Sequence, residues 1–412
     1  MANILPFRGV RPTGEYSSRV AALPYDVFSR AEAYTEAAKD RLSFLNIDRP
    51  ETQFEASVDM YGPEVYRKAR ELLEKRIEEK ILIQDEQKCY YLYELIMNGR
   101  SQTGLVACAS IDDYIGDVIR KHENTRAEKE ADRIRHVDVC SAQTGPIFLA
   151  YRKNERIAAV TEKVKREVPI YDFVSDDGIT HRCWRIAEKA DITEIRAAFL
   201  EIERIYIADG HHRAASAVRV GLMRRQAHPD YDGTEEFNSF LSVLFPDEEL
   251  MIMDYNRVVK DLNDLSETQF LHCAEEKFVI RKCSCAKKPE KKGTIMMYLG
   301  DSWYEMTVRE SFASDDPVEG LDVSILQREL LAPVLGITDP KKDPRIDFIG
   351  GIRGLEELER RVHQDCAVAF AMYPTSITEL FAVADAGLLM PPKSTWFEPK
   401  LRSGLFIHKI EE

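Results

Sequence analysis

Two pairs of strand-like segments, each joined by a short turn, constrain the fold more than any other feature of this sequence. Cys89–Met97 and Thr103–Ile111 lie on either side of an Asn-Gly dipeptide, which favours the tightest hairpin turns. Thr294–Leu299 and Trp303–Val308 are joined through Gly-Asp in the same way. Because hairpin strands pair antiparallel and helical patterns lie between them, the sequence predicts an α+β (mixed α/β) fold with mixed sheets and hairpins.

Helical and strand patterns alternate along the rest of the chain. Further strands are expected at Pro146–Tyr151, Arg204–Ala208, Phe240–Phe245, Met251–Val259 and Ala367–Met372. The expected helices are Arg30–Arg41, Glu64–Lys80, Ala127–Val139, Glu155–Glu167, Ile192–Glu203, Ser266–Glu276, Val323–Leu335, Leu355–His363 and Ser376–Ala386.

A polar stretch near the middle of the chain is the expected boundary between two lobes. A chain of 412 residues is long enough for two or three domains, or for one large α/β unit. Gln226–Glu236 carries a Pro and a Gly between two strongly patterned regions. We therefore expect an N-terminal lobe of residues 1–232 and a C-terminal α/β lobe of residues 233–412, acting together as one functional unit.

The charge balance limits the kinds of partner. Lys and Arg number 57 against 71 Asp and Glu, a formal net charge of −14, which argues against a protein whose main task is to coat nucleic acid. The sequence shows no apolar run of membrane-spanning length and no pattern of a secretory signal, and its eight cysteines form no dense framework. These features predict a globular cytoplasmic protein, and they leave open whether it forms a homo-oligomer.

The segment Tyr206–Ala217 carries the strongest functional signal. A short apolar strand is followed by Asp-Gly and then by His211, His212 and Arg213 at the start of a helix of small residues. A helix N-terminus already carries partial positive charge and unpaired N–H groups, so three cation-capable side chains there are unfavourable unless an anion binds. Gly210 permits close approach of the backbone. The pattern predicts a phosphate site.

Asp209 ends the strand of this segment and has three possible roles. Its carboxylate could orient a histidine, hold Mg²⁺ or accept a proton. The simpler alternative is that Asp209 caps the helix and that the two histidines are exposed polar residues.

Segments along nearly the whole chain resemble a known family. The chain resembles the family catalogued as domain of unknown function 1015. From the N-terminus onward, the segments that carry the resemblance are Ala22–Val27, His122–Thr125 with Asp132-Arg133, Tyr206–Arg213, Leu321–Val323 and Met390–Lys400. The family motif usually has Pro-Pro-Tyr-Asp where this chain has Leu23-Pro24-Tyr25-Asp26, a change that bears on loop rigidity more than on chemistry.

Asp209-Gly210-His211-His212-Arg213 is also similar to the phosphate-binding signature of the ParB/sulfiredoxin superfamily. It is most similar to the version in archaeal free-serine kinases of that fold. This resemblance implies a ParB/sulfiredoxin-like core, elaborated here with a second α/β lobe, and a helix that holds nucleotide phosphates. Sulfiredoxin chemistry needs a Cys within the signature, where this chain has His211.

A second polar motif, His122-Glu123-Asn124-Thr125, precedes a predicted helix. Glu123 is the candidate general base for a substrate hydroxyl, and His122 beside it is a candidate phosphate ligand. Arg133, about two turns along the helix, is another candidate phosphate ligand. The alternative is a simple helix cap, because Thr125 and Glu128 satisfy the capping-box pattern.

Two further motifs are weaker candidates. Lys393 offers a charge for phosphate, and Ser394 and Thr395 offer hydroxyls, but the same segment could equally be a rigid surface tail. Asp26 follows a short strand and either contacts substrate or metal or makes a turn.

Together these motifs favour phosphoryl transfer. The expected ligands are a nucleotide, ATP or ADP with Mg²⁺, and a small anionic or phosphorylated metabolite. The resemblance to archaeal free-serine kinases implies a free-serine kinase; an O-phosphoserine phosphatase using the same pocket remains open, because both need an anion clamp and a base. A ParB-like nucleotide-binding regulator is the non-enzymatic alternative. We expect His122-Glu123, Asp209–Arg213 and Lys393–Thr395 to converge between the lobes.

Overall fold

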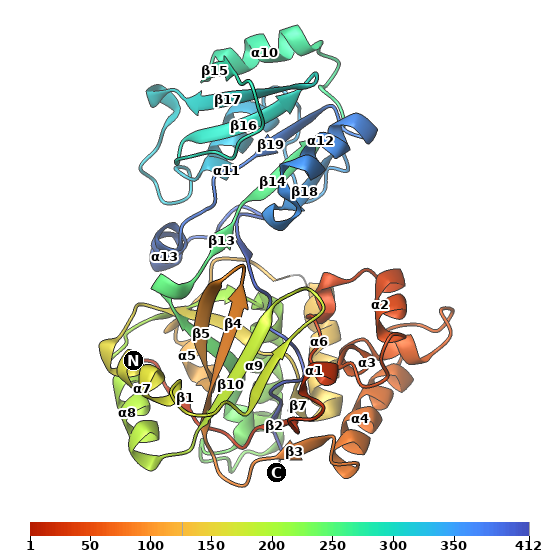
Figure 1. Ribbon diagram of the computed structural model, residues 1–412, viewed down its shortest axis with the longest axis vertical. Coiled ribbons are helices and arrows are strands. Elements are labelled where there is room, and N and C mark those ends of the chain that lie inside the picture. The colour runs from red at the N-terminus through yellow and green to blue at the C-terminus, as the bar shows by residue number, and fades with distance from the viewer. Residues whose placement is uncertain (126, 412) are drawn as a thin grey trace. The chain divides into compact units, whose positions relative to one another are not determined.

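The computed structural model describes residues 1–125 and 127–411, and the chain divides into two compact units (Figure 1). The first unit comprises Met1–Leu250 with Pro399–Glu412, and the second comprises Met251–Glu398. Both units contain helices and sheets, and the larger sheet has parallel as well as antiparallel pairs, which confirms the mixed α/β prediction. In the described residues, no helix has the length and apolar composition needed to cross a membrane.

A nine-stranded sheet forms the centre of the first unit. Its strands run in the order β6-β11-β8-β12-β5-β4-β10-β9, and β1 pairs with β5 off this path. The strands are β1 (Ile4–Leu5), β4 (Tyr90–Met97), β5 (Arg100–Ser110), β6 (Ile119–Arg120), β8 (Ile147–Tyr151), β9 (Tyr171–Val174), β10 (Thr180–Ile186), β11 (Ile205–Asp209) and β12 (Ser239–Pro246). Two small pairs join β2 (Val10–Pro12) to β3 (Leu82–Gln84) and β7 (Ala142–Gln143) to β21 (His408–Lys409).

The hairpin expected around Asn-Gly is present at the centre of this sheet. Asn98 and Gly99 have φ values of 51° and 78°, the left-handed conformation that a two-residue hairpin turn requires at both central positions. Met97 pairs with Arg100 across the turn, and β4 and β5 lie antiparallel along their length. Local turn chemistry therefore sets the register of the two central strands.

Helices of the first unit pack on the sheet and on one another. They are α1 (Ser17–Val20), α2 (Arg30–Ala37), α3 (Leu45–Asp48), α4 (Pro63–Glu78), α5 (Ile111–Ile115), α6 (Ala127–Cys140), α7 (Glu155–Val164), α8 (Lys189–Phe199) and α9 (His211–Ala227), with short 3₁₀ turns η1 (Tyr25–Val27) and η2 (Pro50–Gln53). Helix α4 packs against α3 and α6, and α6 packs against α9. A layer of helices thus connects the N-terminal region to α9.

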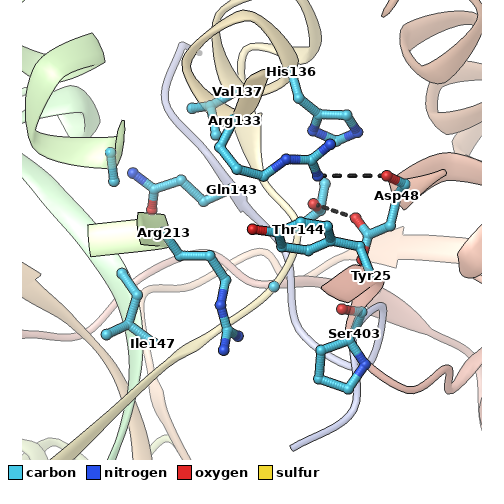
Figure 2. Close-up of a pocket in the computed structure, with 13 residues that line it drawn as sticks. Tyr25, Asp48, Arg133, His136, Val137, Gln143, Thr144, Ile147, Arg213 and Ser403 are labelled. Atoms are coloured by element: carbon cyan, nitrogen blue, oxygen red, sulfur yellow. Dashed lines mark hydrogen bonds between the residues drawn. The ribbon is translucent and has the colours of Figure 1, made fainter. Parts of the chain in front are cut away.

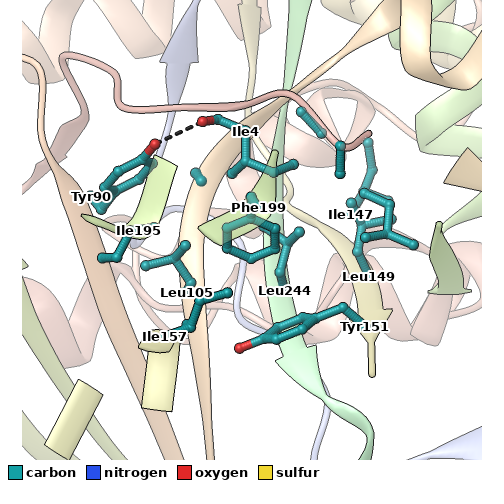
Figure 3. Packing of buried hydrophobic residues seen from close by; sticks show 14 of the residues in the cluster. Ile4, Tyr90, Leu105, Ile147, Leu149, Tyr151, Ile157, Ile195, Phe199 and Leu244 are labelled. Atoms are coloured by element: carbon teal, nitrogen blue, oxygen red, sulfur yellow. Dashed lines mark hydrogen bonds between the residues drawn. The ribbon is translucent and has the colours of Figure 1, made fainter. Parts of the chain in front are cut away.

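A buried apolar cluster holds the sheet to α7 and α8. Phe199, Ile195 and Ile157 from the helices meet Leu105, Leu149 and Leu244 from the strands (Figure 3). The hydroxyl of Tyr90 donates to the carbonyl of Ile4 at 2.7 Å, so this buried polar group is paired.

The second unit is built on an antiparallel six-stranded sheet of order β15-β17-β16-β19-β14-β18. Its strands are β14 (Tyr255–Val259), β15 (Phe278–Lys282), β16 (Thr294–Leu299), β17 (Ser302–Val308), β18 (Ile346–Gly350) and β19 (Val368–Ala371), and β13 (Ile252–Met253) pairs with β20 (Trp396–Phe397). The helices are α10 (Glu267–Glu275), α11 (Asp322–Leu326), α12 (Gly354–Gln364) and α13 (Ile377–Asp385). The second predicted hairpin is β16–β17.

The division between the units differs from the expected boundary at 232/233. Strand β12 follows the polar stretch Gln226–Glu236, yet it pairs with both β5 and β8 inside the first sheet. The polar stretch therefore connects α9 to β12 within one unit. The last residues of the chain also return to the first unit, where β21 pairs with β7.

A test of this core compares two neighbouring positions at the end of α8. Phe199 is fully buried, whereas Leu200 is 42% exposed. We expect Phe199→Ala to lower the free energy of unfolding by about 3–5 kcal/mol, because it leaves a cavity in the cluster. Leu200→Ala should change it by less than about 1 kcal/mol. Urea unfolding followed by circular dichroism measures both, and equal effects would contradict this account of the core.

Candidate phosphate site at the start of helix α9

The junction of β11 and α9 has the geometry expected of a phosphate site. Gly210 adopts φ 94° and ψ 30°, a left-handed conformation that turns the chain sharply from the strand into the helix. Oδ1 of Asp209 accepts a hydrogen bond from the Gly210 N–H at 2.8 Å. Helix α9 begins at His211 with no side-chain cap, and no acidic residue lies in its first turn. The N-terminal partial charge of this 17-residue helix is therefore available to an anion.

Two cations meet the carboxylate of Asp209. Lys400 Nζ lies 3.4 Å from Oδ2, and Arg213 Nη2 lies 3.7 Å from the same oxygen. Burial by itself would raise the pKa of Asp209, but the charges of Lys400 and Arg213 outweigh it and hold the pKa well below its usual value. Asp209 is thus a fixed anion that gathers cations at the helix start, and it is a weak proton acceptor.

Arg213 is oriented along the helix start. Its Nη1 donates to the carbonyl of Pro146, while its Nε is buried and makes no hydrogen bond within the part of the chain that the structure describes. A buried guanidinium N–H without an acceptor is costly, so this atom is a donor available to a ligand.

His122 and His211 form a buried pair. Their rings are 4.5 Å apart and nearly perpendicular, and the His122 backbone N–H lies 3.5 Å from His211 Nε2. Burial lowers the pKa of His122 to about 4, and burial with the neighbouring His122 holds the pKa of His211 well below its usual value. Both imidazoles are therefore neutral near pH 7. This changes the expectation of three clustered cations, because the fold keeps His211 uncharged and places Arg213 against Asp209.

Strand pairing explains why the His122-Glu123 segment lies close to the Asp209–Arg213 segment. Strands β6 and β11 are parallel neighbours, with Tyr206 opposite Arg120, so the residues that follow each strand leave the sheet at the same edge. Glu123 Oε2 lies 3.9 Å from His211 Nδ1, and its side chain is about half exposed. His212 lies one residue further on α9, and its backbone carbonyl accepts from Ser216 Oγ at 2.7 Å. Of the predicted site residues, His122, Glu123 and the Asp209–Arg213 segment are brought together.

A small cavity of about 30 Å³ adjoins Arg213 (Figure 2). Tyr25, Arg133 and Asp48 line it with Arg213, and Thr144 Oγ1 donates to Asp48 Oδ1 at 2.7 Å. Arg133 Nη1 donates to the backbone carbonyl of Asp48 at 3.4 Å. Arg213 therefore connects the start of α9 to a region formed by the N-terminal helices and α6.

Arg133 is buried in an ion pair. Its Nε and Nη2 both lie 2.9 Å from Oδ2 of Asp132, and its guanidinium stands 4.1 Å from the centre of the Tyr25 ring. Burial raises the pKa of Tyr25 to about 12, although the charge of Arg133 lowers it. Phosphate binding by Arg133 stays a prediction, since Asp132 already occupies two of its donors.

The remaining sequence candidates are divided between the two units. Lys393, Ser394 and Thr395 belong to the second unit, where Lys393 Nζ is 5.4 Å from the centre of the Tyr255 ring and Ser394 Oγ donates to the Pro391 carbonyl at 2.7 Å. Their convergence with the α9 motif stays a prediction. Asp26 lies in η1 and is exposed. Thr125 Oγ1 donates to Glu130 Oε2 at 2.9 Å.

Lys400 is the site residue that sequence reasoning missed. It lies 191 positions from Asp209 along the chain, at the end of the Met390–Lys400 motif. In that motif the sequence offers Lys393 as the candidate phosphate ligand, although the last residue of the motif is also a lysine. A cation after Pro399 was the only available signal, and the sequence does not indicate which carboxylate it meets.

The site does not fit a metal held by Asp209. Among residues 1–125 and 127–411, no group of three or more His, Cys, Asp or Glu side chains is arranged to hold a metal ion. The Asp209 carboxylate also faces Lys400 and Arg213 at 3.4 Å and 3.7 Å, and two cations this close repel a third. We therefore do not expect Asp209 to hold Mg²⁺.

Comparison with known families agrees with the motifs. The model of the family described as "Protein of unknown function (DUF1015)" matches residues 4–324. The chain belongs to this family. Its Asp209–Arg213, His122–Thr125 and Tyr25-Asp26 segments all lie within the matched range. None of the curated proteins matches the chain.

The solved structures that are similar to this DUF1015 protein include the following three. SbnI with a C-terminal truncation from Staphylococcus aureus is 11% identical, with a TM-score of 0.37 over 72% of this chain and 85% of that chain. A conserved hypothetical protein from Pyrococcus furiosus is 14% identical, with a TM-score of 0.35 over 73% and 94%. A free serine kinase in complex with AMP is 12% identical, with a TM-score of 0.34 over 73% and 91%.

The neutral histidine pair predicts a pH-dependent stability. Because the folded pKa values of His122 and His211 lie below the value of about 6.5 in an unfolded chain, the unfolded chain binds protons first as pH falls. The stability from the neutral His122 ring is complete above about pH 6.5 and is lost toward pH 4, and the effect of His211 has the same sign. We expect a loss of about 2 kcal/mol from His122 at pH 5, measured by urea unfolding at pH 7.5 and 5.0.

Two variants separate this effect from other titrating groups. His122→Asn should reduce the stability loss between pH 7.5 and 5.0, whereas His228→Asn, at an exposed position beyond the end of α9, should leave it unchanged. An unaltered loss in His122→Asn would show that this ring does not titrate as described.

Proposed function

We propose that this protein transfers a phosphoryl group between a nucleotide and the hydroxyl of a small hydroxy amino acid, as a free-serine kinase. The observation that carries the proposal is the start of α9, where the helix N-terminus, Arg213 and Lys400 gather around one carboxylate. Such a site suits phosphoryl transfer, which depends on positioning and charge stabilisation more than on covalent catalysis.

The roles of the residues follow from their surroundings. The Gly210 turn lets the backbone approach a phosphate, and the first N–H groups of α9 with Arg213 and Lys400 stabilise its charge. His211 and His212 supply ring N–H donors. The imidazole of His211 is neutral, so it contributes a hydrogen bond rather than charge.

Glu123 is the proposed proton acceptor. Its carboxylate is about half exposed and lies beside His211, whereas Asp209 is held as an anion by two cations. In the reaction, the substrate hydroxyl oxygen forms a bond to the terminal phosphorus of the nucleotide, the bond from that phosphorus to the bridging oxygen breaks, and the hydroxyl proton passes to Glu123. The shortened nucleotide leaves with the bridging oxygen.

The choice of serine and of ATP or ADP rests on the resemblance of Asp209–Arg213 to the signature of archaeal free-serine kinases. The exposed carboxylate and the anion site would also serve hydrolysis of O-phosphoserine, with water in place of the serine hydroxyl. Direct assay separates the two directions.

We expect the purified full-length protein, with serine, Mg²⁺ and either ATP or ADP, to form O-phosphoserine visible by phosphorus NMR. Release of inorganic phosphate from added O-phosphoserine without nucleotide would instead identify the phosphatase direction. If both nucleotides and O-phosphoserine remain intact, phosphoryl transfer at this site is wrong.

Two arginines on α9 test whether Arg213 contacts the phosphate. Arg213→Ala should reduce kcat/KM at least about 100-fold, because it removes a guanidinium that contacts the transferring charge. Arg219→Ala removes an exposed arginine less than two turns along the same helix and should retain kcat/KM within about twofold. Similar losses in both variants would point to a general effect on α9 rather than a phosphate contact.

A further inference from the structure

A second, larger cavity lies next to the one beside Arg213. It has a volume of about 180 Å³ and shares Tyr25 and Arg133 with the smaller cavity. Its other walls come from η1, η2, α4, the loop before α4, and α6, all in the first unit. A ligand here would therefore contact Tyr25 and Arg133, which also line the cavity beside Arg213.

The size of the cavity points to a small ligand. Sites for drug-sized molecules typically measure about 300–1,000 Å³, and a nucleotide belongs in that range. A cavity of about 180 Å³ is better matched to a metabolite of a few non-hydrogen atoms.

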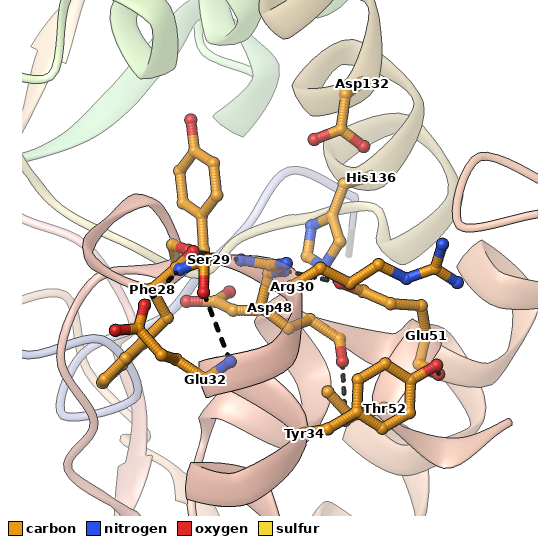
Figure 4. A network of polar contacts seen from close by, with 12 residues as sticks. Phe28, Ser29, Arg30, Glu32, Tyr34, Asp48, Glu51, Thr52, Asp132 and His136 are labelled. Carbon is orange, nitrogen blue, oxygen red and sulfur yellow. Dashed lines mark hydrogen bonds and ion pairs between the residues drawn. The ribbon is translucent and has the colours of Figure 1, made fainter. Parts of the chain in front are cut away.

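The deep walls of this cavity are charged but internally satisfied. Arg49 Nε lies 2.6 Å from Oε1 of the buried Glu51, and Asp132 accepts from the Tyr66 hydroxyl at 2.8 Å as well as from Arg133. Figure 4 shows Asp132 on α6 facing the segment that carries Glu51. Burying this many charges is expensive, and their pairing gives the cavity a rigid polar wall.

Two further charged groups at the cavity have no protein partner among the described residues. Asp26 in η1 and Lys129 on α6 line the cavity and are exposed, and within the described residues neither charged group forms an ion pair or hydrogen bond. They carry opposite signs, which matches a ligand that has both a negative and a positive group. A ligand with one charge would pair with only one of them, and an uncharged nucleobase with neither.

We propose that this cavity binds the amino-acid acceptor as a zwitterion, with Lys129 contacting its carboxylate and Asp26 contacting its ammonium group. The inference rests on the proposed function in taking an amino acid as the acceptor. It adds where that acceptor lies, beside Tyr25 and Arg133, and which residues select it. The side-chain hydroxyl is then the only uncharged polar group of serine, free to meet a phosphate held at α9.

Binding of three related molecules to the full-length protein tests this inference. L-serine carries both charges, serinamide lacks the carboxylate and 3-hydroxypropionate lacks the ammonium group. Calorimetry without nucleotide should show serine binding at least about 10-fold more tightly than either analogue. Equal affinity for all three would overturn the proposal.

Charge-removing variants assign each contact. Lys129→Met should weaken serine binding about 10-fold or more and remove the preference for serine over serinamide. Asp26→Asn should do the same for the preference over 3-hydroxypropionate. Lys75→Met, at an exposed position on α4 outside the cavity, is the control and should bind all three as the parent does. If the variants weaken ADP binding and leave serine binding unchanged, the cavity belongs to the nucleotide and the proposal is wrong.

The outcomes separate this inference from the proposed function. If the parent phosphorylates serine and both variants keep its KM for serine, the cavity assignment fails while the kinase function stands. If the parent binds zwitterions through Asp26 and Lys129 but transfers no phosphoryl group from ATP or ADP, the kinase function fails while the cavity assignment stands.

Discussion

The contact of Asp209 with Lys400 and Arg213 is the interaction on which the site depends. One carboxylate at the end of β11 holds a cation from the helix that follows and a cation from the C-terminal segment of the chain. The same carboxylate pairs with the Gly210 N–H through its other oxygen, which fixes the left-handed turn into α9. Loss of this anion would therefore disturb the backbone turn and both cations together.

Neutral histidines let the remaining groups crowd into a small space. If His122 and His211 were charged, two cations would face each other at 4.5 Å beside Arg213 and a helix N-terminus. Burial keeps both rings uncharged near pH 7, so the positive charge at the site comes from Arg213, Lys400 and the helix. A site of this composition suits the phosphate that we propose, and without a ligand its positive charge is partly balanced by Asp209.

Features set by local chemistry could be predicted from the sequence, and features set by distant pairing could not. The Asn98-Gly99 hairpin and the strand–turn–helix around Gly210 follow from residues that are adjacent in the chain. The unit boundary could not be placed, because the pairing of β12 with β5 and β8 is not visible in the residues of β12. Lys400 and the charged cavity beside Tyr25 were missed for the same reason, since each joins segments far apart in sequence.

The most direct test of the central claim is an NMR titration of the full-length protein with pyrophosphate, observing backbone amide and arginine Nε–H signals. The account predicts that the largest shifts occur at Gly210, His211 and the Arg213 Nε–H, and that they disappear in Arg213→Ala while Arg219→Ala retains the backbone shifts. Pyrophosphate binding whose largest shifts lie away from the start of α9, or no binding at millimolar concentration, would contradict the assignment of this helix as the phosphate site.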